Sequence, residues 1–376
     1  MINRILYKYL VKEFFKGKII ILIGPRQVGK TTLLRKIEKK IKVKSLWLNA
    51  DESDIKNEFN NANTSTELLQ LIGKETKLVI IDEAQQIENI GLKLKLLHDS
   101  FPKIQIIATG SSAFDLQDAT NEALTGRKRT YQIFPISFEE IVGHTSLLEA
   151  KRLLETRIIY GSYPEVINQF GDERKVLTEL ADSYLYKDIL RLEGIRKPKY
   201  IEKLVRALAL QLGSEVSFNE LARTIGNIDV ATVEKYIHLL EKAFIIFELS
   251  AYSRNLRNEI KKGKKYYFYD TGVRNAIINN FASLNLRTDK GALWENFLIN
   301  ERMKFNSYHE NYTNRFFWRT KDQAEIDYIE EIDGTLFAYE FKWQKEKSKL
   351  PNSFNTAYPQ NAFKVINKNN FKDFIL

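Results

Sequence analysis

Residues 24–31 constrain the surrounding architecture more strongly than any other part of the chain. They read GPRQVGKT, which matches the phosphate-binding pattern G-x-x-x-x-G-K-T. An unbroken apolar run, residues 19–23, precedes the motif and is typical of a strand buried on both faces of a parallel sheet. The residues after Thr31 have the composition of a helix. A strand, a phosphate loop and a helix in this order predict a site for a nucleoside triphosphate.

Each part of the motif has a chemical reason. Gly24 and Gly29 permit the backbone angles that turn N–H groups inward around a β-phosphate. The helix that begins there adds the positive end of its dipole. Lys30 is expected to reach the β- and γ-phosphates, and the Thr31 hydroxyl to ligate Mg²⁺. The predicted cofactors are therefore ATP and Mg²⁺.

A second apolar run, residues 78–81, ends in the adjacent carboxylates Asp82 and Glu83. This run predicts a buried strand that delivers Asp82 to the phosphate loop, where it would hold Mg²⁺ through water. Glu83 is placed to orient or deprotonate the attacking water. Adjacent carboxylates after an apolar strand are typical of the P-loop class with an extra catalytic glutamate, so hydrolysis is predicted as well as binding.

Further candidates for the nucleotide site lie later in the chain. Thr109, Ser111 and Ser112 end a strand predicted to begin at residue 103, and could sense the γ-phosphate. Arg127 and Arg129 are candidates for a charge-stabilising catalytic arginine, which a neighbouring subunit could receive. A basic loop is the alternative interpretation of both. The predicted nucleotide-binding residues are Gly24, Pro25, Arg26, Gln27, Val28, Gly29, Lys30, Thr31, Thr32, Thr109 and Ser111.

Strands that alternate with helices over residues 18–140 predict an α/β fold with a parallel, doubly wound sheet. The fifth strand is predicted at residues 131–135. Three helices followed by a basic hairpin predict a winged helix-turn-helix. The predicted domains are a P-loop ATPase core (1–140), a helical lid (141–198), the winged helix (199–270) and a small α/β domain (271–376).

Charged residues gather in the predicted carboxy-terminal strands. In YEFKW, Glu340 and Lys342 fall on one sheet face and the aromatic residues on the other. Asp327 lies on the preceding strand, beyond a turn at Asp333-Gly334, and Glu295 on the helix before the strands. These four residues predict a divalent-metal site that activates water against a phosphodiester. Chance on an amphipathic strand, or a nuclease-like fold that binds without cutting, are the alternatives.

The charge of the chain favours an anionic partner, and DNA is predicted first. The formal net charge is +10 and the isoelectric point about 9.3. The third helix of the winged segment has outward positions at Thr232, Lys235 and His238, which would enter a major groove. The hairpin would contact phosphates through its basic residues Arg254, Arg257, Lys261, Lys262, Lys264 and Lys265. A winged helix that contacts protein, with a solvated basic loop, is the alternative.

Several classes of protein are disfavoured by composition. The chain has no cysteine, which excludes a disulfide framework and a thiolate metal site. The four histidines lack metal-ligand spacing. No apolar run approaches the roughly 18 residues needed to span a membrane, and the first 18 residues lack the features of a signal peptide. We therefore expect a cytoplasmic protein without a membrane partner.

The order of these motifs resembles a known family. GPRQVGKTTLL, IIDEAQ, IATGSS, the GR before YQIFPISFEEI, GSYPEV, YFYDTGVRNAI, GALWENF and WR…EIDYI…YEFKW are similar to motifs of archaeal and bacterial AAA-type ATPases with a C-terminal domain of uncharacterised function. The resemblance extends from Lys18 over nearly the whole chain. It implies an ATPase of the extra-glutamate class, a lid, a winged helix and a restriction-endonuclease-like C-terminal domain. The matching site residues are Lys30, Thr31, Asp82, Glu83, Asp327, Glu340 and Lys342.

Three functional hypotheses follow. The leading one is an ATP-hydrolysing, DNA-associated switch or motor whose nucleotide state positions the winged helix and the C-terminal domain. The second is a signalling or scaffold ATPase, with a protein partner and a C-terminal domain that binds without cutting. The third is a metal-dependent DNA nuclease gated by ATP. Each is compatible with a homo-oligomer.

Overall fold

The structure is a computed structural model that describes residues 2–111, 116, 120–183, 198–253, 263–344 and 347–376. Its chain divides into two compact units, which we describe separately. The first unit comprises residues 1–135 with the short segment 242–244, and the second comprises residues 136–241 and 245–376.

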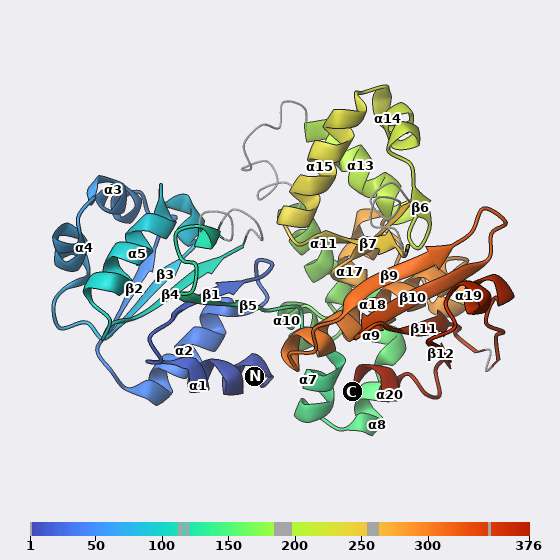
Figure 1. The fold of residues 1–376 in the computed structure, drawn as a ribbon, viewed down its shortest axis with the longest axis horizontal. Coiled ribbons are helices and arrows are strands. Elements are labelled where there is room, and N and C mark those ends of the chain that lie inside the picture. The colour runs from blue at the N-terminus through green and yellow to red at the C-terminus, as the bar shows by residue number, and fades with distance from the viewer. Residues whose placement is uncertain (1, 112–115, 117–119, 184–197, 254–262, 345–346) are drawn as a thin grey trace. The chain divides into compact units, whose positions relative to one another are not determined.

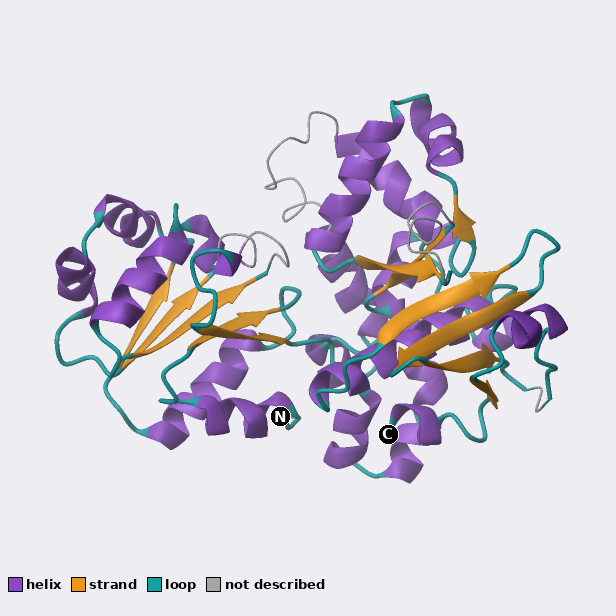
Figure 2. Ribbon diagram, viewed as in Figure 1, coloured by secondary structure: helices purple, strands orange, loops and turns teal. Residues whose placement is uncertain are grey.

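The first unit is built on a sheet of five parallel strands, shown in Figure 2 with helices around it. The strand order is β2-β3-β4-β1-β5. All five residues of β1 are buried, as its apolar sequence predicted. The strands are β1 (Ile19–Ile23), β2 (Ser45–Asn49), β3 (Leu78–Asp82), β4 (Gln105–Gly110) and β5 (Lys128–Gln132). The parallel, doubly wound α/β sheet is thereby confirmed.

Helices cover both faces of this sheet. In Figure 1, α1 and α2 lie on one face, and α3, α4 and α5 lie on the other. The helix α3 was not predicted, because its sequence is almost entirely polar and only Phe59 is buried. The helices are α1 (Leu6–Glu13), α2 (Lys30–Ile41), α3 (Ser53–Asn61), α4 (Ser65–Ile72) and α5 (Ile90–Ser100), with a short 3-10 helix η1 (Ala84–Gln86) after β3.

The strand order creates the crevice in which a ligand is expected. Strand β1 lies between β4 and β5, so its neighbours in the sheet are not its neighbours in the chain. In open parallel sheets, ligands bind beyond the carboxyl ends of the strands at the point where the winding direction changes. Residues that follow β1, β3 and β4 therefore meet at one edge of the sheet.

The second unit has helices before its first strand and further helices between and after its strands. They are α7 (Phe138–His144), α8 (Leu147–Arg152), α9 (Leu154–Tyr160), α10 (Pro164–Asn168), α11 (Glu173–Ser183), α13 (Pro198–Leu210), α14 (Phe218–Gly226), α15 (Val230–Lys242), α17 (Thr271–Ile277), α18 (Lys290–Tyr308), α19 (Asn352–Ala357) and α20 (Lys372–Ile375), with a 3-10 turn η3 at Leu284–Leu286. Helix α11 and the three helices before it lie in the segment predicted as a helical lid, of which residues 184–197 lie outside the described residues.

One seven-stranded sheet runs through the second unit, in the order β12-β11-β10-β9-β7-β8-β6. The predicted hairpin is confirmed as the antiparallel pair β7 and β8. Its strand β7 also pairs in parallel with β9, where Ser250 lies opposite Phe316. The strands are β6 (Glu215–Val216), β7 (Ile246–Ala251), β8 (Lys264–Phe268), β9 (Asn314–Arg319), β10 (Glu325–Ile332), β11 (Thr335–Phe341) and β12 (Asn361–Ile366). The hairpin and the carboxy-terminal strands thus form one continuous sheet.

The turn between two of the carboxy-terminal strands was predicted from its local sequence. The turn between β10 and β11 is confirmed, since Asp333 and Gly334 have φ angles of 49° and 80°, as a tight hairpin requires. Helix α18 packs against β8 and β11 and is buried on most of its surface.

None of the helices described here is long and apolar enough to cross a membrane.

Candidate active site

The phosphate loop has the backbone shape that its glycines predict. Gly24 has φ 155°, and a Cβ atom there would lie only 2.2 Å from the carbonyl oxygen of Ile133. Gly29 has φ 94° and lies at the N-cap of α2. A side chain at Gly24 would collide with backbone, and one at Gly29 would strain the turn into the helix. Both glycines are therefore required for the loop to close over β1.

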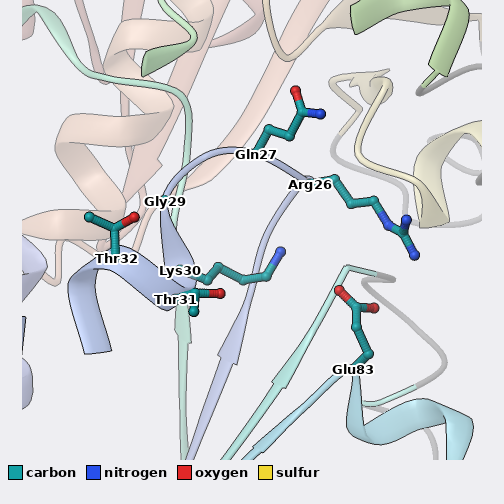
Figure 3. A pocket seen from close by; sticks show the side chains of 7 residues that line it. All are labelled: Arg26, Gln27, Gly29, Lys30, Thr31, Thr32 and Glu83. Carbon is teal, nitrogen blue, oxygen red and sulfur yellow. The ribbon is translucent and has the colours of Figure 1, made fainter. Parts of the chain in front are cut away.

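Lys30 lies across the inside of this loop, as Figure 3 shows. Its side chain is 6% exposed, and its Nζ donates hydrogen bonds to the carbonyl oxygens of Gly24 at 2.7 Å and Pro25 at 2.9 Å. The ammonium group is thus held where the loop N–H groups and the N-terminus of α2 converge. This concentration of positive potential suits a phosphate.

The Asp82 carboxylate accepts hydrogen bonds from two hydroxyl groups, one on α2 and one on β4. Thr31 Oγ1 donates to Asp82 Oδ2 at 3.1 Å, and the Thr109 hydroxyl donates to Asp82 Oδ1. The predicted set of Thr31, Asp82 and Thr109 is therefore brought together from α2, β3 and β4. A carboxylate beside a hydroxyl is the hard oxygen donor set that Mg²⁺ prefers, so these residues fit the predicted metal.

Glu83 is the next residue in the chain and lines a cavity beside the phosphate loop. Its backbone is left-handed, with φ 50°, which turns its side chain away from the path of β3. Ser111 Oγ donates to Glu83 Oε2 at 2.7 Å, and Gln85 Nε2 donates to the same oxygen at 2.6 Å. The contribution of Gln85 was not predicted, although it lies within the IIDEAQ motif. Ser112 lies outside the described residues.

The loop and Glu83 enclose a cavity of about 240 Å³. In Figure 3, Lys30 and Glu83 face each other across it. Arg26 lies 3.9 Å from Asp51, and the side chain of Val28 is fully buried. The residues that line the cavity are Arg26, Gln27, Gly29, Lys30, Thr31, Thr32 and Glu83.

The structure does not bring Arg127 to this cavity. Its carbonyl oxygen accepts from the backbone N–H of Ile19, which places Arg127 at the amino edge of the sheet, opposite the phosphate loop. Its side chain donates to Asp99 at 2.7 Å, and Arg129 pairs with Glu13 at 3.0 Å. Arg127 therefore does not reach the site of its own chain.

Strand β5 begins at Lys128, upstream of its predicted start at residue 131, because it pairs with all of β1.

The four charged residues predicted in the carboxy-terminal strands do converge. Burial, followed by the carboxylates of Glu295 and Glu340, raises the pKa of Asp327 well above its ordinary value. One Asp327 oxygen accepts from the backbone N–H of Phe341 at 2.7 Å. Lys342 Nζ lies 2.6 Å from a Glu340 oxygen. The cluster combines α18, β10 and β11, as the alternation of the strands predicted.

Lys265 is an unpredicted member of this cluster. Its side chain is 1% exposed, and its Nζ lies 2.5 Å from Glu325 and 3.4 Å from Glu295. The Tyr267 hydroxyl, two residues along β8, also donates to Glu295. Burial alone would lower the pKa of Lys265, but the two carboxylates raise it. A cation supplied by the chain itself thus lies among the carboxylates.

Lys265 therefore cannot belong to the basic wing that was predicted, because it is buried. Lys264 is 36% exposed and pairs with Glu248 at 2.8 Å, so its place on the wing stays a prediction. On α15, Lys235 and His238 are exposed and Thr232 is partly exposed, as predicted. The other predicted wing residues, Arg254, Arg257, Lys261 and Lys262, lie outside the described residues.

The carboxylates of this cluster are the predicted ligands of a second metal ion. Within the described ranges, no group of three or more His, Cys, Asp or Glu side chains is arranged to hold a metal ion. Glu295 is engaged by Lys265 and Tyr267, and Glu340 by Lys342. The predicted residues are close together, but their oxygens accept from ammonium, hydroxyl or backbone N–H groups of the chain.

Comparison with family models divides the chain into three matched regions. Residues 16–142 match a family described as an AAA domain. Residues 151–284 and 290–373 match two domains of unknown function, DUF8612 and DUF4143.

Similar proteins occur in bacteria and archaea. An uncharacterized protein of Mycobacterium tuberculosis is 26% identical over 341 residues, which covers 89% of this chain and 72% of that protein. An uncharacterized protein of Methanocaldococcus jannaschii is 25% identical over 335 residues, which covers 84% and 73%.

A solved structure shares the fold. It is a Walker-type ATPase of Pyrococcus abyssi, with a TM-score of 0.53 and 18% identity, covering 74% of this chain and 96% of that one. This likeness shows a shared fold, and residues 16–142 of the chain match the AAA domain model.

Proposed function

We propose that this protein binds and hydrolyses ATP with Mg²⁺, and that its nucleotide state controls the carboxy-terminal half of the chain. One observation carries the proposal. Lys30 and Thr31 at the N-terminus of α2 and Glu83 after β3 line one cavity, and the Thr31 hydroxyl donates to Asp82 at the end of β3. This combination provides phosphate binding, metal binding and a base in one place.

The residues divide the chemistry among them. Lys30 would leave its loop carbonyls and pair with the β- and γ-phosphate oxygens, while the N–H groups of the loop hold the β-phosphate. Thr31 and Asp82 would hold Mg²⁺, which supplies charge neutralisation across the phosphates. Thr109 keeps the Asp82 carboxylate oriented, because it donates to the oxygen that Thr31 does not use.

Glu83 would orient the attacking water and accept its proton. Its Oε2 accepts from Ser111 and Gln85, so Oε1 is the oxygen left to face water. Ser111 therefore acts through Glu83 and positions it. Thr109 likewise acts through Asp82, so the sensing of a γ-phosphate by these hydroxyls would be indirect.

For the second unit we propose association with DNA. The order α13, β6, α14, α15, β7, β8 supports a winged helix in which α15 is the third helix. Lys235 and His238 are exposed on α15, and the net charge of +10 favours an anionic partner. The order α18, β9, β10, β11, α19, β12 supports the restriction-endonuclease-like domain that the resemblance implied.

Lys265 favours a C-terminal domain that binds without cutting over an ATP-gated nuclease. The Lys265 ammonium group pairs with Glu295, so one of the predicted metal ligands already faces a cation of the chain. The signalling or scaffold ATPase is therefore the second candidate function. A protein partner or a homo-oligomer would then receive the nucleotide-dependent signal, and in an oligomer Arg127 could serve a neighbouring site.

Three assays test these proposals. Lys30→Ala should abolish ATP binding in a titration with a fluorescent nucleotide, and wild-type phosphate release should require Mg²⁺. Duplex binding that weakens steeply with salt would support contact with DNA, whereas absent binding would leave the scaffold. DNA incubated with Mg²⁺ or Mn²⁺ should stay intact with wild type. Cleavage by wild type that Lys342→Ala abolishes would establish the nuclease instead.

A further inference from the structure

Arg4 bridges two segments of the first unit that lie far apart in the chain. Its Nη1 donates to the carbonyl oxygen of Val28 at 2.6 Å, and its Nη2 donates to that of Phe134 at 2.5 Å. Val28 belongs to the phosphate loop, and Phe134 follows β5. The planar fork of a guanidinium can satisfy two acceptors at once with little loss of further freedom. One side chain thus fixes the spacing between these segments.

The contact with Val28 sets the direction of a loop peptide. A trans peptide is planar, so its C=O and the following N–H point in opposite directions. Because the Val28 carbonyl is turned toward Arg4, the N–H of Gly29 is turned away from Arg4. This orientation goes with the φ of 94° at Gly29, and inward N–H groups are what bind a phosphate in such a loop. Arg4 therefore holds the loop in its phosphate-receiving form.

The contact with Phe134 fixes the segment that leads out of the first unit. Pro135 follows, so the peptide between them has no N–H and its carbonyl is its only hydrogen-bonding group. The preceding residue, Ile133, lies against Gly24 of the phosphate loop. The next residue, Ile136, begins the second unit. Arg4 thus ties the phosphate loop to the last residues of the segment 1–135 of the first unit.

Arg4 is itself held in place by the packing of its own segment. Leu6 and Leu10 of α1 are buried, at 4% and 0% exposure. On one side of Arg4, Lys36 of α2 donates to the side chain of Asn3 at 2.6 Å. These contacts explain why a residue near the amino terminus can keep two short hydrogen bonds. Arg4 lies outside the region that matches the AAA domain family, which begins at residue 16.

We propose that Arg4 is a positioning residue for nucleotide binding, which acts through the Val28–Gly29 peptide and couples the phosphate loop to the segment 133–135. This inference rests on the proposed ATPase function. Loss of the guanidinium would leave two carbonyls without their charged donor and free the loop peptide to rotate. Hydrogen bonds to charged groups are typically worth enough that their loss weakens an equilibrium by about tenfold or more.

The test compares four proteins: wild type, Arg4→Ala, Arg4→Lys and the control Lys8→Ala. Lys8 is an exposed residue of α1, the helix that follows Arg4. Dissociation constants for ADP and ATP are measured with a fluorescent nucleotide, and thermal unfolding is followed in parallel. Arg4→Ala should weaken both nucleotides about tenfold or more, Lys8→Ala should not, and Arg4→Lys should recover part of the affinity because an ammonium can replace one of the two bonds.

The outcomes separate this inference from the proposed function. Nucleotide binding by Arg4→Ala at wild-type strength would overturn the positioning role and leave the ATPase intact. If wild type binds no nucleotide, the proposed function fails and the role of Arg4 with it. If Arg4→Ala is unfolded, Arg4→Lys decides. That variant should fold with the unfolding temperature of Lys8→Ala and still bind nucleotide more weakly, and equal affinity would contradict the inference.

Discussion

The hydroxyl of Ser111 donates a hydrogen bond of 2.7 Å to the carboxylate of Glu83. The two residues follow β4 and β3, which are neighbours in the parallel sheet. Gln85 donates to the same carboxylate oxygen. The proposed base is thus held by two donors that leave its other oxygen toward the cavity.

Ser111→Ala should lower the rate of ATP hydrolysis about tenfold, because Glu83 loses one of the two donors that orient it. The affinity for ATP should stay within about threefold of wild type, since Ser111 acts through Glu83. Steady-state phosphate release and a nucleotide titration measure the two quantities, with Ser53→Ala, an exposed serine of the same unit, as the control. A weakened affinity at an unchanged rate would instead place Ser111 in contact with nucleotide.

Lys265→Met should destabilise the second unit by roughly 3 kcal/mol or more, because Glu295 and Glu325 would be left without their buried counter-charge. Its neighbour provides a matched control. Lys264 is 36% exposed and pairs with Glu248 at the surface, so Lys264→Met should cost less than about 1 kcal/mol. Unfolding in urea measures both, and equal midpoints for the two variants would contradict the structural role of Lys265.

Asp327 should make the stability of the second unit fall as pH rises. Its pKa is raised in the folded state by burial and by Glu295 and Glu340, against about 3.9 for an unfolded aspartate. Between these two pKa values the folded state binds more protons, so the free energy of unfolding decreases with increasing pH. Asp327→Asn removes this titration and keeps an oxygen for the N–H of Phe341. Urea unfolding should show a smaller loss between pH 4 and pH 8 for the variant, and parallel profiles would refute the assignment.

Lys235→Glu should weaken the binding of duplex DNA and reduce the salt dependence of binding by about one counterion. Lys235 is exposed on α15, where the proposed winged helix would face the major groove. The control is Lys74→Glu, which makes the same charge change at an exposed residue of the first unit. Fluorescence anisotropy at several salt concentrations separates specific from general electrostatic loss, and equal effects of both variants would remove α15 from the interface.

Most of the candidate site was predictable because its residues lie at, or directly after, the carboxyl ends of strands of one parallel sheet. The apolar runs before Gly24, Asp82 and Thr109 mark buried strands, and parallel strands bring their carboxyl ends to one edge. A regular fold therefore brings together residues that are far apart in the chain but lie at corresponding ends of their strands. The prediction placed strand β5 too far along the chain. KRTYQ is an edge strand with partly exposed residues, so its bounds are set by its pairing with β1 and not by its composition.

The contacts that were missed join elements that no local pattern connects. Lys265 was expected on a basic wing, since a lysine within a hairpin gives no sign of the carboxylates on α18 and β10. The pairing of β7 with β9 joins two segments predicted to be separate domains. Arg4 reaches Val28 and Phe134 across 24 and 130 residues. Such contacts depend on tertiary packing, which a periodicity cannot specify.

Glu83→Gln is the most direct test of the central claim, that this cavity hydrolyses ATP with Glu83 as the base. Glutamine keeps the shape and an oxygen that can accept from Ser111 and Gln85, but it cannot take a proton from water. We predict that Glu83→Gln binds ATP with a dissociation constant within about threefold of wild type, while Mg²⁺-dependent phosphate release falls about 100-fold or more. Phosphate release by Glu83→Gln at the wild-type rate would contradict the account.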